Sequence, residues 1–92
     1  MQKLIQKKRG KRIRDFKPSM KLLTRIMRVM LEKNSMVRTS LSQEANINYS
    51  RLVKHLVWLK QKGLAEFAVE KGKANVVLTA NGREFATTIN SI

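Results

Sequence analysis

Residues 40–64 read SLSQEANINYSRLVKHLVWLKQKGL and contain the pattern that decides the fold. Two helices separated by a tight turn account for this stretch. The first helix is short, over residues 41–45, and Ser40 and Gln43 have the spacing of a capping box. Either Thr39 or Ser40 is therefore expected to cap this helix.

The second helix follows a turn at residues 46–48. Asn48 is its expected N-cap and Gly63 its expected stop, which places the helix at residues 49–62. Three leucines repeat at i, i+4 and i+7, which is the spacing of a core-facing stripe, and two valines widen the apolar side. These residues are Leu52, Leu56, Leu59, Val53 and Val57.

A longer helix is expected before this pair. Pro18-Ser19 is typical of a helix start, with Ser19 as the N-cap, and the helix extends over residues 20–33. Its polar residues form a narrow stripe, so its broad apolar surface is expected at the centre of the core, with part of it available as a dimer contact. The stripe consists of Lys21, Arg25, Arg28 and Glu32. Residues 34–35 end the helix, and residues 36–38 are a short extended stretch.

After Gly63 the hydrophobic period changes from that of a helix to that of a strand. Residues 64–70 and 75–79 are two strand-like runs around a turn at residues 71–74, which predicts a β-hairpin with a basic tip. Thr79 then caps a last helix. The apolar residues at helical spacing in that helix are Phe85, Ile89 and Ile92.

The expected order is therefore helix, short strand, helix, turn, helix, hairpin and helix. This is the order of a small winged helix-turn-helix domain of the α+β class, with the hairpin as the wing. In such a domain the exposed N-terminal half of the second paired helix enters the major groove of DNA, and the first helix braces it. We assign residues 19–92 to this domain and residues 1–18 to a separate basic arm.

The charge of the chain is strongly positive and unevenly distributed. There are 20 Lys and Arg against 6 Asp and Glu, a formal net charge of +14 and a pI near 11.1. Such a charge favours a polyanionic partner, with nucleic acid first and an anionic membrane surface second. Half of the net charge lies in residues 1–18, which we interpret as a mobile arm rather than a solvated tail without a role or a helix that docks on a partner subunit.

Composition excludes several classes of protein. The chain has no Cys and one His, which leaves no disulfide framework and neither a thiolate nor a multi-histidine metal site. No apolar run is long enough to span a membrane and no interfacial amphipathic helix is recognisable, so no membrane partner is expected. The glutamates form no pair with acid–base spacing, so the protein is not expected to be an enzyme, and no cofactor or small-molecule ligand is predicted. A cytoplasmic, nucleoid-associated location is expected.

Four short patterns run through residues 21–85. They are Arg25-Ile26-Met27, Thr39-x-Leu41-x-x-x-Ala45-x-Ile47, Tyr49-x-x-Leu52-x-x-x-Leu56-x-x-Leu59-x-x-x-Gly63-Leu64 and Leu78-Thr79-x-x-Gly82-x-x-Phe85. In these patterns the chain resembles small archaeal winged-helix DNA-binding proteins, in particular the group similar to the ArnR-like transcription regulators. The resemblance implies binding to double-stranded DNA, often as a homodimer, in transcription regulation or chromatin organisation.

The resemblance places the DNA-reading face on the first turns of the helix at residues 49–62. An Arg there can read guanine, and a Ser or Lys can hold phosphate. The predicted DNA-binding residues are Asn48, Tyr49, Ser50, Arg51 and Lys54 around that helix, Arg38 before the helix pair, Lys71 and Lys73 at the hairpin tip, and Lys7, Lys8, Arg9, Lys11, Arg12 and Arg14 in the arm.

Some of these side chains have an ordinary structural alternative. Asn48 is first of all a cap, with any DNA contact secondary, and Tyr49 is equally suited to packing on the preceding helix. Trp58 is expected to cover the root of the wing rather than to stack on a base. His55 is interpreted as a packed or edge residue rather than a ligand or proton carrier.

Two other functions remain open at this point. A winged helix with a basic tail also resembles a small-subunit ribosomal protein of archaea and eukaryotes, which implies binding to RNA by shape. The wide apolar face of residues 20–31 also allows a protein-interaction module. A homodimer through the first or last helix is the expected assembly, because proteins with wings usually read paired half-sites.

Overall fold

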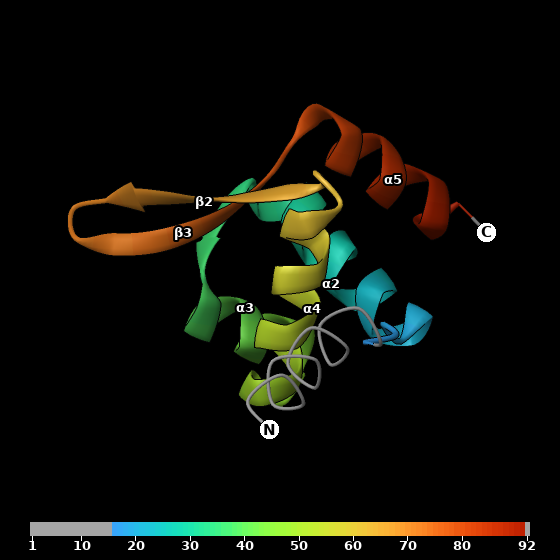
Figure 1. Ribbon diagram of the computed structural model, residues 1–92, viewed down its shortest axis with the longest axis horizontal. Coiled ribbons are helices and arrows are strands. Elements are labelled where there is room, and N and C mark those ends of the chain that lie inside the picture. The colour runs from blue at the N-terminus through green and yellow to red at the C-terminus, as the bar shows by residue number, and fades with distance from the viewer. Residues whose placement is uncertain (1–15, 92) are drawn as a thin grey trace, which may run out of the picture.

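The computed structural model describes residues 16–91, which form four helices and a small sheet. Figure 1 shows the hairpin of this sheet projecting to one side of the helices. The elements of this part are α2 (Met20–Lys33), β1 (Ser35–Val37), α3 (Arg38–Ala45), α4 (Tyr49–Gln61), β2 (Ala65–Glu70), β3 (Lys73–Leu78) and α5 (Ala80–Asn90). The order confirms the α+β winged helix-turn-helix fold. The predicted arm residues up to 15, and Ile92 in the last apolar stripe, lie outside the described residues.

Helix α2 forms the centre of the core, as its broad apolar face predicts. Ser19 is the N-cap, and its Oγ accepts a hydrogen bond from the Leu22 N–H at 3.3 Å. Four side chains of the helix are completely buried, and they are Leu23, Ile26, Met27 and Met30. Met20 at the first turn is 54% exposed, so the apolar surface continues to the outside of the molecule at this end.

The start of α3 differs from the prediction. Val37 is the N-cap, without a side-chain hydrogen bond, and Arg38 is the first helical residue instead of the end of the extended stretch. Thr39 and Ser40 lie inside the helix, so neither is the cap. The reason is strand pairing, because β1 joins β3 with Val37 opposite Asn75, and the helix begins directly where that pairing ends.

The turn and helix α4 follow the prediction closely. Asn46 takes a left-handed conformation at the end of α3, and Asn48 caps α4 through its Oδ1, which accepts from the N–H groups of Ser50 (2.9 Å) and Arg51 (3.4 Å). The predicted leucine stripe of α4 is buried. Val57 does not widen it, because this side chain is 42% exposed.

The sheet has the order β1-β3-β2 and is antiparallel throughout. The hairpin turn is shorter than predicted and contains only Lys71 and Gly72, with φ values of 51° and 78°. Two central residues with positive φ form the turn type that matches the twist of paired strands. Lys73 and the residue after it therefore belong to β3, and Lys73 lies opposite Glu70.

One junction joins the end of α4, the base of the wing and the start of α5. The Thr79 N–H donates to the Leu64 carbonyl (3.1 Å), and the Thr79 hydroxyl donates to the Gly63 carbonyl (2.7 Å). The same hydroxyl oxygen accepts from the Gly82 N–H at 3.0 Å and so caps α5. A Cβ on Gly82 would lie 1.8 Å from the Leu64 carbonyl oxygen. We call these four residues the Thr79 junction.

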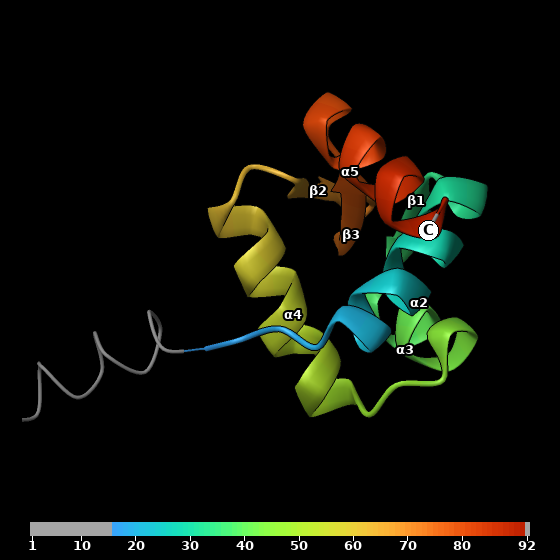
Figure 2. The same ribbon diagram turned by 90° about the vertical axis from the view of Figure 1, so that its right-hand side faces the viewer.

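Helix α5 packs against α2, as Figure 2 shows from the side of the two helices. Its Ala86 is buried, and Phe85 and Ile89 are half-buried against the core. Two side-chain hydrogen bonds fasten the contact, from Arg83 to Asn34 (2.7 Å) and from Arg28 to Asn90 (3.4 Å). No helix in the described part of the chain is both long and apolar enough to cross a membrane.

The Thr79 junction leads to a stability prediction. Gly82→Ala is expected to lower the free energy of unfolding by about 1–3 kcal/mol, although Ala is the better helix former, because its methyl group collides with the Leu64 backbone. Asn81→Ala, at the exposed neighbouring position of α5, is the matched control and should be neutral or slightly stabilising. Urea unfolding of both variants measures this, and equal stability of the two would contradict the close approach.

Candidate nucleic-acid interface

The outward face of α4 is a single line of exposed side chains. Ser50, Lys54, Val57 and Gln61 are spaced by four, three and four residues, which places them on one side of a helix. The leucines on the opposite side of α4 are in the core, so this line is the side of the helix that faces away from the core. Val57 was assigned to the apolar side in the sequence, but the structure places it between the polar residues of this exposed line.

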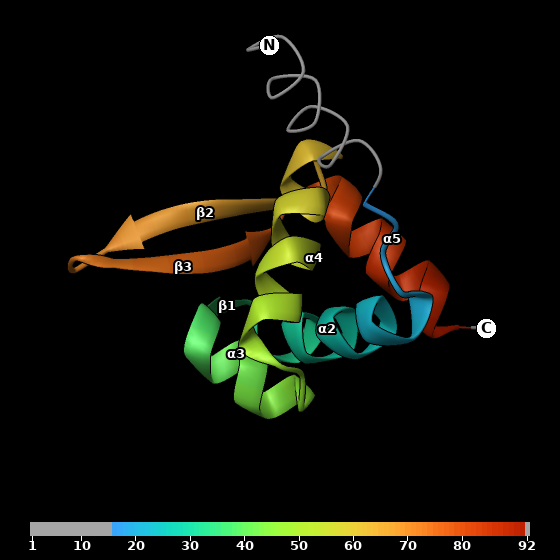
Figure 3. The ribbon, with the colours of Figure 1, turned by 60° about the horizontal axis from the view of Figure 1, so that its bottom comes forward.

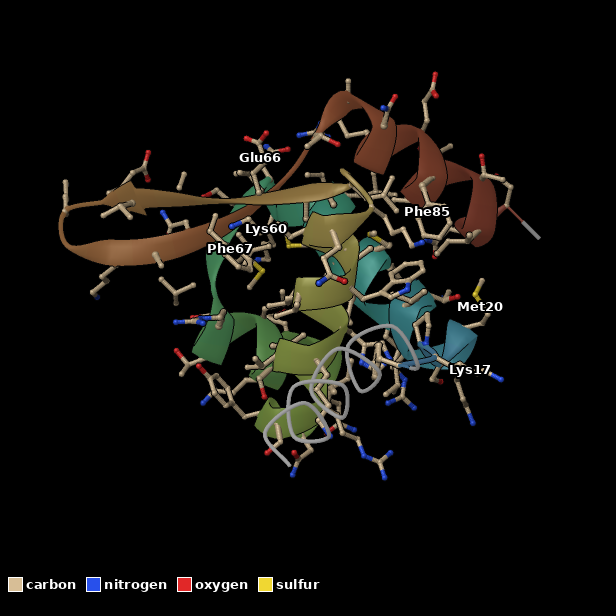
Figure 4. All side chains as sticks on the ribbon, in the orientation of Figure 1. Lys17, Met20, Lys60, Glu66, Phe67 and Phe85 are labelled. Carbon is tan, nitrogen blue, oxygen red and sulfur yellow. The ribbon has the colours of Figure 1, made fainter. Side chains whose placement is uncertain are left out.

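Different parts of the structure border the two edges of α4. On one edge the wing approaches, and the Lys60 ammonium lies 5.2 Å from the centre of the Phe67 ring of β2. Figure 4 shows these two side chains next to each other. On the other edge lies the segment before α2, where Phe16 contacts His55 with ring centres 5.1 Å apart. Figure 3 shows the wing and this segment, coloured blue, on opposite sides of α4. The exposed line lies between them.

Three of the predicted site residues meet at a shallow hollow beside the start of α4. Arg38 comes from the first turn of α3, Tyr49 from the first turn of α4 and Lys73 from β3. The hollow is completed by Val37, Thr39 and Ala74. Tyr49 is 44% exposed although it lies against the start of α3, so its hydroxyphenyl group is available at the surface. The fold thus brings two cations and an exposed aromatic ring together from three elements.

The wing tip carries the remaining predicted cations of the domain. Lys71 and Lys73 are both exposed, Lys71 in the turn and Lys73 at the start of β3. They share a shallow depression with Glu70 and Asn75, and the Asn75 amide donates to Glu70 Oε1 at 2.8 Å. The Glu70 carboxylate therefore offsets part of the positive charge at the tip.

Arg51 lies on the edge of α4 that is next to Phe16 and His55, away from the wing. Its carbonyl oxygen lies 2.7 Å from Nδ1 of His55 one turn later, while its own side chain is exposed. Asn48 uses its Oδ1 for the cap. Of the residues predicted on this helix, Ser50 and Lys54 therefore lie on the outward line, whereas Tyr49 and Arg51 border it.

His55 is a packed residue, as predicted, and it also joins α4 to the segment before α2. It is 4% exposed, and its Nε2 accepts the Ser19 N–H at 3.0 Å. Because a backbone N–H only donates, Nε2 must carry the lone pair, so Nδ1 carries the proton and donates to the Arg51 carbonyl. Both bonds therefore exist together only with the neutral ring.

Two lysines at the end of α4 and at its C-cap are turned toward aromatic rings. The Lys62 ammonium is 5.8 Å from the Trp58 ring centre, as the Lys60 ammonium is from Phe67 at 5.2 Å. Trp58 itself is partly buried and packed against the core, and its covering of the wing root stays a prediction. The positive charge of α4 is thus divided, with Lys54 facing outward and Lys60 directed at the wing.

Sequence reasoning missed Thr39 and Val57 as surface residues of this face. Thr39 was one of two predicted caps, with Ser40 as the other, and Val57 was predicted to widen the apolar side of its helix. The exposure of Val57 could have been found from its spacing to Ser50 and Lys54, which is that of one helix face. The predicted arm contacts Lys7, Lys8, Arg9, Lys11, Arg12 and Arg14 lie outside the described residues.

The chemistry of this face is that of a surface for a large anion. It offers Lys and Arg charges and Ser, Thr and Tyr hydroxyls around shallow hollows, which suit phosphate groups and base edges. Within residues 16–91, no group of three or more His, Asp or Glu side chains is placed to hold a metal ion.

Comparison with known proteins identifies the fold. No protein-family model matches the chain, and no curated protein is similar to it in sequence. Among solved structures, a MarR family transcriptional regulator from Silicibacter pomeroyi has a TM-score of 0.69 at 18% identity, over 95% of this chain and 61% of that one. The DNA-binding protein Sso10a-2 from Sulfolobus solfataricus has a TM-score of 0.71 at 23% identity, over 82% of this chain and 77% of that one.

A third similar structure is that of reduced AbfR bound to DNA. Its TM-score is 0.63 at 19% identity, over 75% of this chain and 54% of that one. The chain thus spans less than two thirds of the Silicibacter regulator and of AbfR. At these identities the likeness shows the fold, which is that of a winged-helix protein.

The cap of α4 leads to a second stability prediction. Asn48→Ala is expected to lower the free energy of unfolding by about 1 kcal/mol, because the N–H groups of Ser50 and Arg51 lose their acceptor. Asn48→Ser keeps a side-chain acceptor, so it should lower the free energy of unfolding by only a few tenths of a kcal/mol. Thermal unfolding of the two variants measures the difference. If Asn48→Ala melted like the wild type, the cap would not stabilise α4.

Proposed function

We propose that this protein binds double-stranded DNA as a transcription regulator or chromatin-associated factor. In this proposal α4 enters the major groove, which is wide enough to admit an α-helix. The observation that carries the proposal is the convergence of Arg38, Tyr49 and Lys73 at one hollow beside the exposed line of Ser50 and Lys54. A shallow cationic hollow next to the exposed line of α4 suits a duplex better than a small ligand.

The similar structures support this proposal through what their names state. They include transcriptional regulators, a DNA-binding protein and a regulator solved on DNA, and none is named as an enzyme. The resemblance to archaeal ArnR-like regulators and a cytoplasmic, nucleoid-associated location belong to the same proposal. The finer assignment rests on the sequence patterns alone.

The side chains suggest a division of roles. Lys54 and Ser50 meet the floor or wall of the groove first, since they are on the outward line of α4. Arg51 at the border is suited to a guanine edge or a phosphate, and Lys71 and Lys73 to the phosphates beside the groove. The arm, with its six predicted basic contacts, adds affinity that does not depend on sequence and reaches into a minor groove.

The protein is proposed to act as a homodimer. Several apolar side chains of α2 and α5 are only partly buried within one chain, and Met20 at the start of α2 is 54% exposed. The partly buried ones are Leu22, Val29, Leu31, Phe85 and Ile89. Apolar side chains that are left partly exposed in this way are suited to contact with a second copy. Two copies would present two α4 helices to paired half-sites.

Salt dependence tests the electrostatic basis of the proposal. If about six phosphates are contacted, the logarithm of the association constant should fall with the logarithm of salt concentration at a slope of roughly −5. Fluorescence anisotropy of a labelled duplex measures this slope. A slope near zero would rule out binding through phosphates. Tighter binding of structured RNA than of duplex DNA, at equal salt, would instead favour an RNA-binding role.

Two lysines of the same helix provide a matched pair of variants. Lys54→Gln removes a charge from the outward line and should weaken DNA binding about threefold to tenfold while reducing the salt slope by about 0.9. Lys60→Gln removes the same charge from the position over Phe67 and should leave the slope unchanged. Equal effects of the two substitutions would contradict the assignment of the outward line as the DNA-facing surface.

A further inference from the structure

The segment before α2 is attached to the side of α4, although 36 residues separate Ser19 from His55 in the chain. Two contacts make this attachment. The Ser19 N–H donates to His55 Nε2, and the Phe16 ring meets the imidazole edge-on. Within α4, His55 Nδ1 donates to the Arg51 carbonyl and so orients the imidazole. A buried histidine only requires a hydrogen-bond partner for each ring nitrogen, and both partners could lie within its own helix. Here the partner of Nε2 is Ser19, which belongs to the segment that joins the basic arm to the domain.

The place of this attachment matters for the surface beside it. It lies on the edge of α4 that carries Arg51, whereas the wing occupies the other edge at Lys60. The last residues before the domain are therefore fixed on the side of α4 that carries Arg51, opposite the wing. The basic arm precedes these residues in the chain, so it joins the domain beside the groove that α4 is proposed to enter.

We propose that His55 is a positioning residue for DNA binding, which holds the root of the N-terminal basic arm against α4 so that arm and wing engage the duplex from opposite sides of this helix. The inference rests on the proposed DNA-binding function. His55 acts through residues 16–19 and touches no DNA itself. Its benefit is entropic, since the residues at the root of the arm are ordered before binding instead of during it.

Two substitutions at this position separate its two hydrogen bonds. His55→Gln places a side-chain oxygen about as far from the backbone as Nε2, so it keeps an acceptor for the Ser19 N–H. His55→Asn reaches only as far as Nδ1, so it keeps a donor to the Arg51 carbonyl and loses the bond to Ser19. Phe16→Ala is an independent variant that weakens the attachment without changing α4.

The experiment is a mutant cycle between the attachment and the charge of the arm. Each variant is made in the full chain with its natural arm, and again with Lys7, Lys8, Arg9, Lys11, Arg12 and Arg14 all replaced by Gln. Dissociation constants for one labelled DNA duplex are measured by anisotropy at fixed salt and pH. Circular dichroism and thermal unfolding of every variant show that α4 is still formed.

With the natural arm, His55→Asn and Phe16→Ala are expected to weaken binding about fivefold, because residues at the arm root must then be ordered on binding. His55→Gln should bind like the wild type. With the six basic residues of the arm replaced by Gln, all three substitutions should change binding by less than about twofold, since most of the charge that the attachment would position is then absent.

Equal losses with both arms would mean that His55 affects α4 itself, and no loss with either arm would mean that the attachment has no part in binding. Both results overturn the positioning role while leaving the DNA-binding function intact. Failure of the wild type to bind duplex at low salt would be a different result, since it would overturn the proposed function and the positioning role with it.

Discussion

The close approach of α5 to the end of α4 is the constraint on which the rest of this structure depends. Gly82 has no Cβ, and only for that reason can the start of α5 lie against the Leu64 carbonyl. The Thr79 hydroxyl uses both its donor and its acceptor there, to Gly63 and to Gly82. The base of the wing is thereby fixed to the end of α4, and the start of β3 lies beside the first turns of α3 and α4.

This constraint explains why the Leu-x-x-x-Gly-Leu and Leu-Thr-x-x-Gly patterns belong together, although they lie in separate parts of the chain. Gly63, with a φ of 74°, ends α4, and Leu64 supplies the carbonyl to which the Thr79 N–H is bonded. The two patterns therefore contain the residues of one packed junction, and this junction is part of the fold that they predicted.

Local hydrogen bonds made much of the fold predictable. Ser19, Asn48 and Thr79 were all assigned correctly as caps, because a cap depends on backbone groups within three residues of it. The start of α3 and the hairpin turn were wrong, because pairing with β3 sets both of them. No local pattern records that Val37 lies opposite Asn75 or that Lys73 lies opposite Glu70.

The same limit applied to the candidate site. Exposure of Ser50 and Lys54 followed from helical spacing, but the meeting of Arg38, Tyr49 and Lys73 depends on the way β3 passes the start of α3. The attachment of Ser19 to His55 was also unpredictable, since it joins residues 36 positions apart. Sequence reasoning identified the charged residues, and the fold determined which of them share a surface.

The central claim is that one face, made by the exposed line of α4, the hollow at Arg38 and the wing tip, binds duplex DNA. Titration of the ¹⁵N-labelled protein with a short duplex, followed by amide chemical shifts, tests it most directly. The account predicts the largest shifts at residues 38–39, 49–57 and 71–73, with little change at the exposed residues of α5. Shifts concentrated on α2 and α5, with residues 49–57 unchanged, would contradict it.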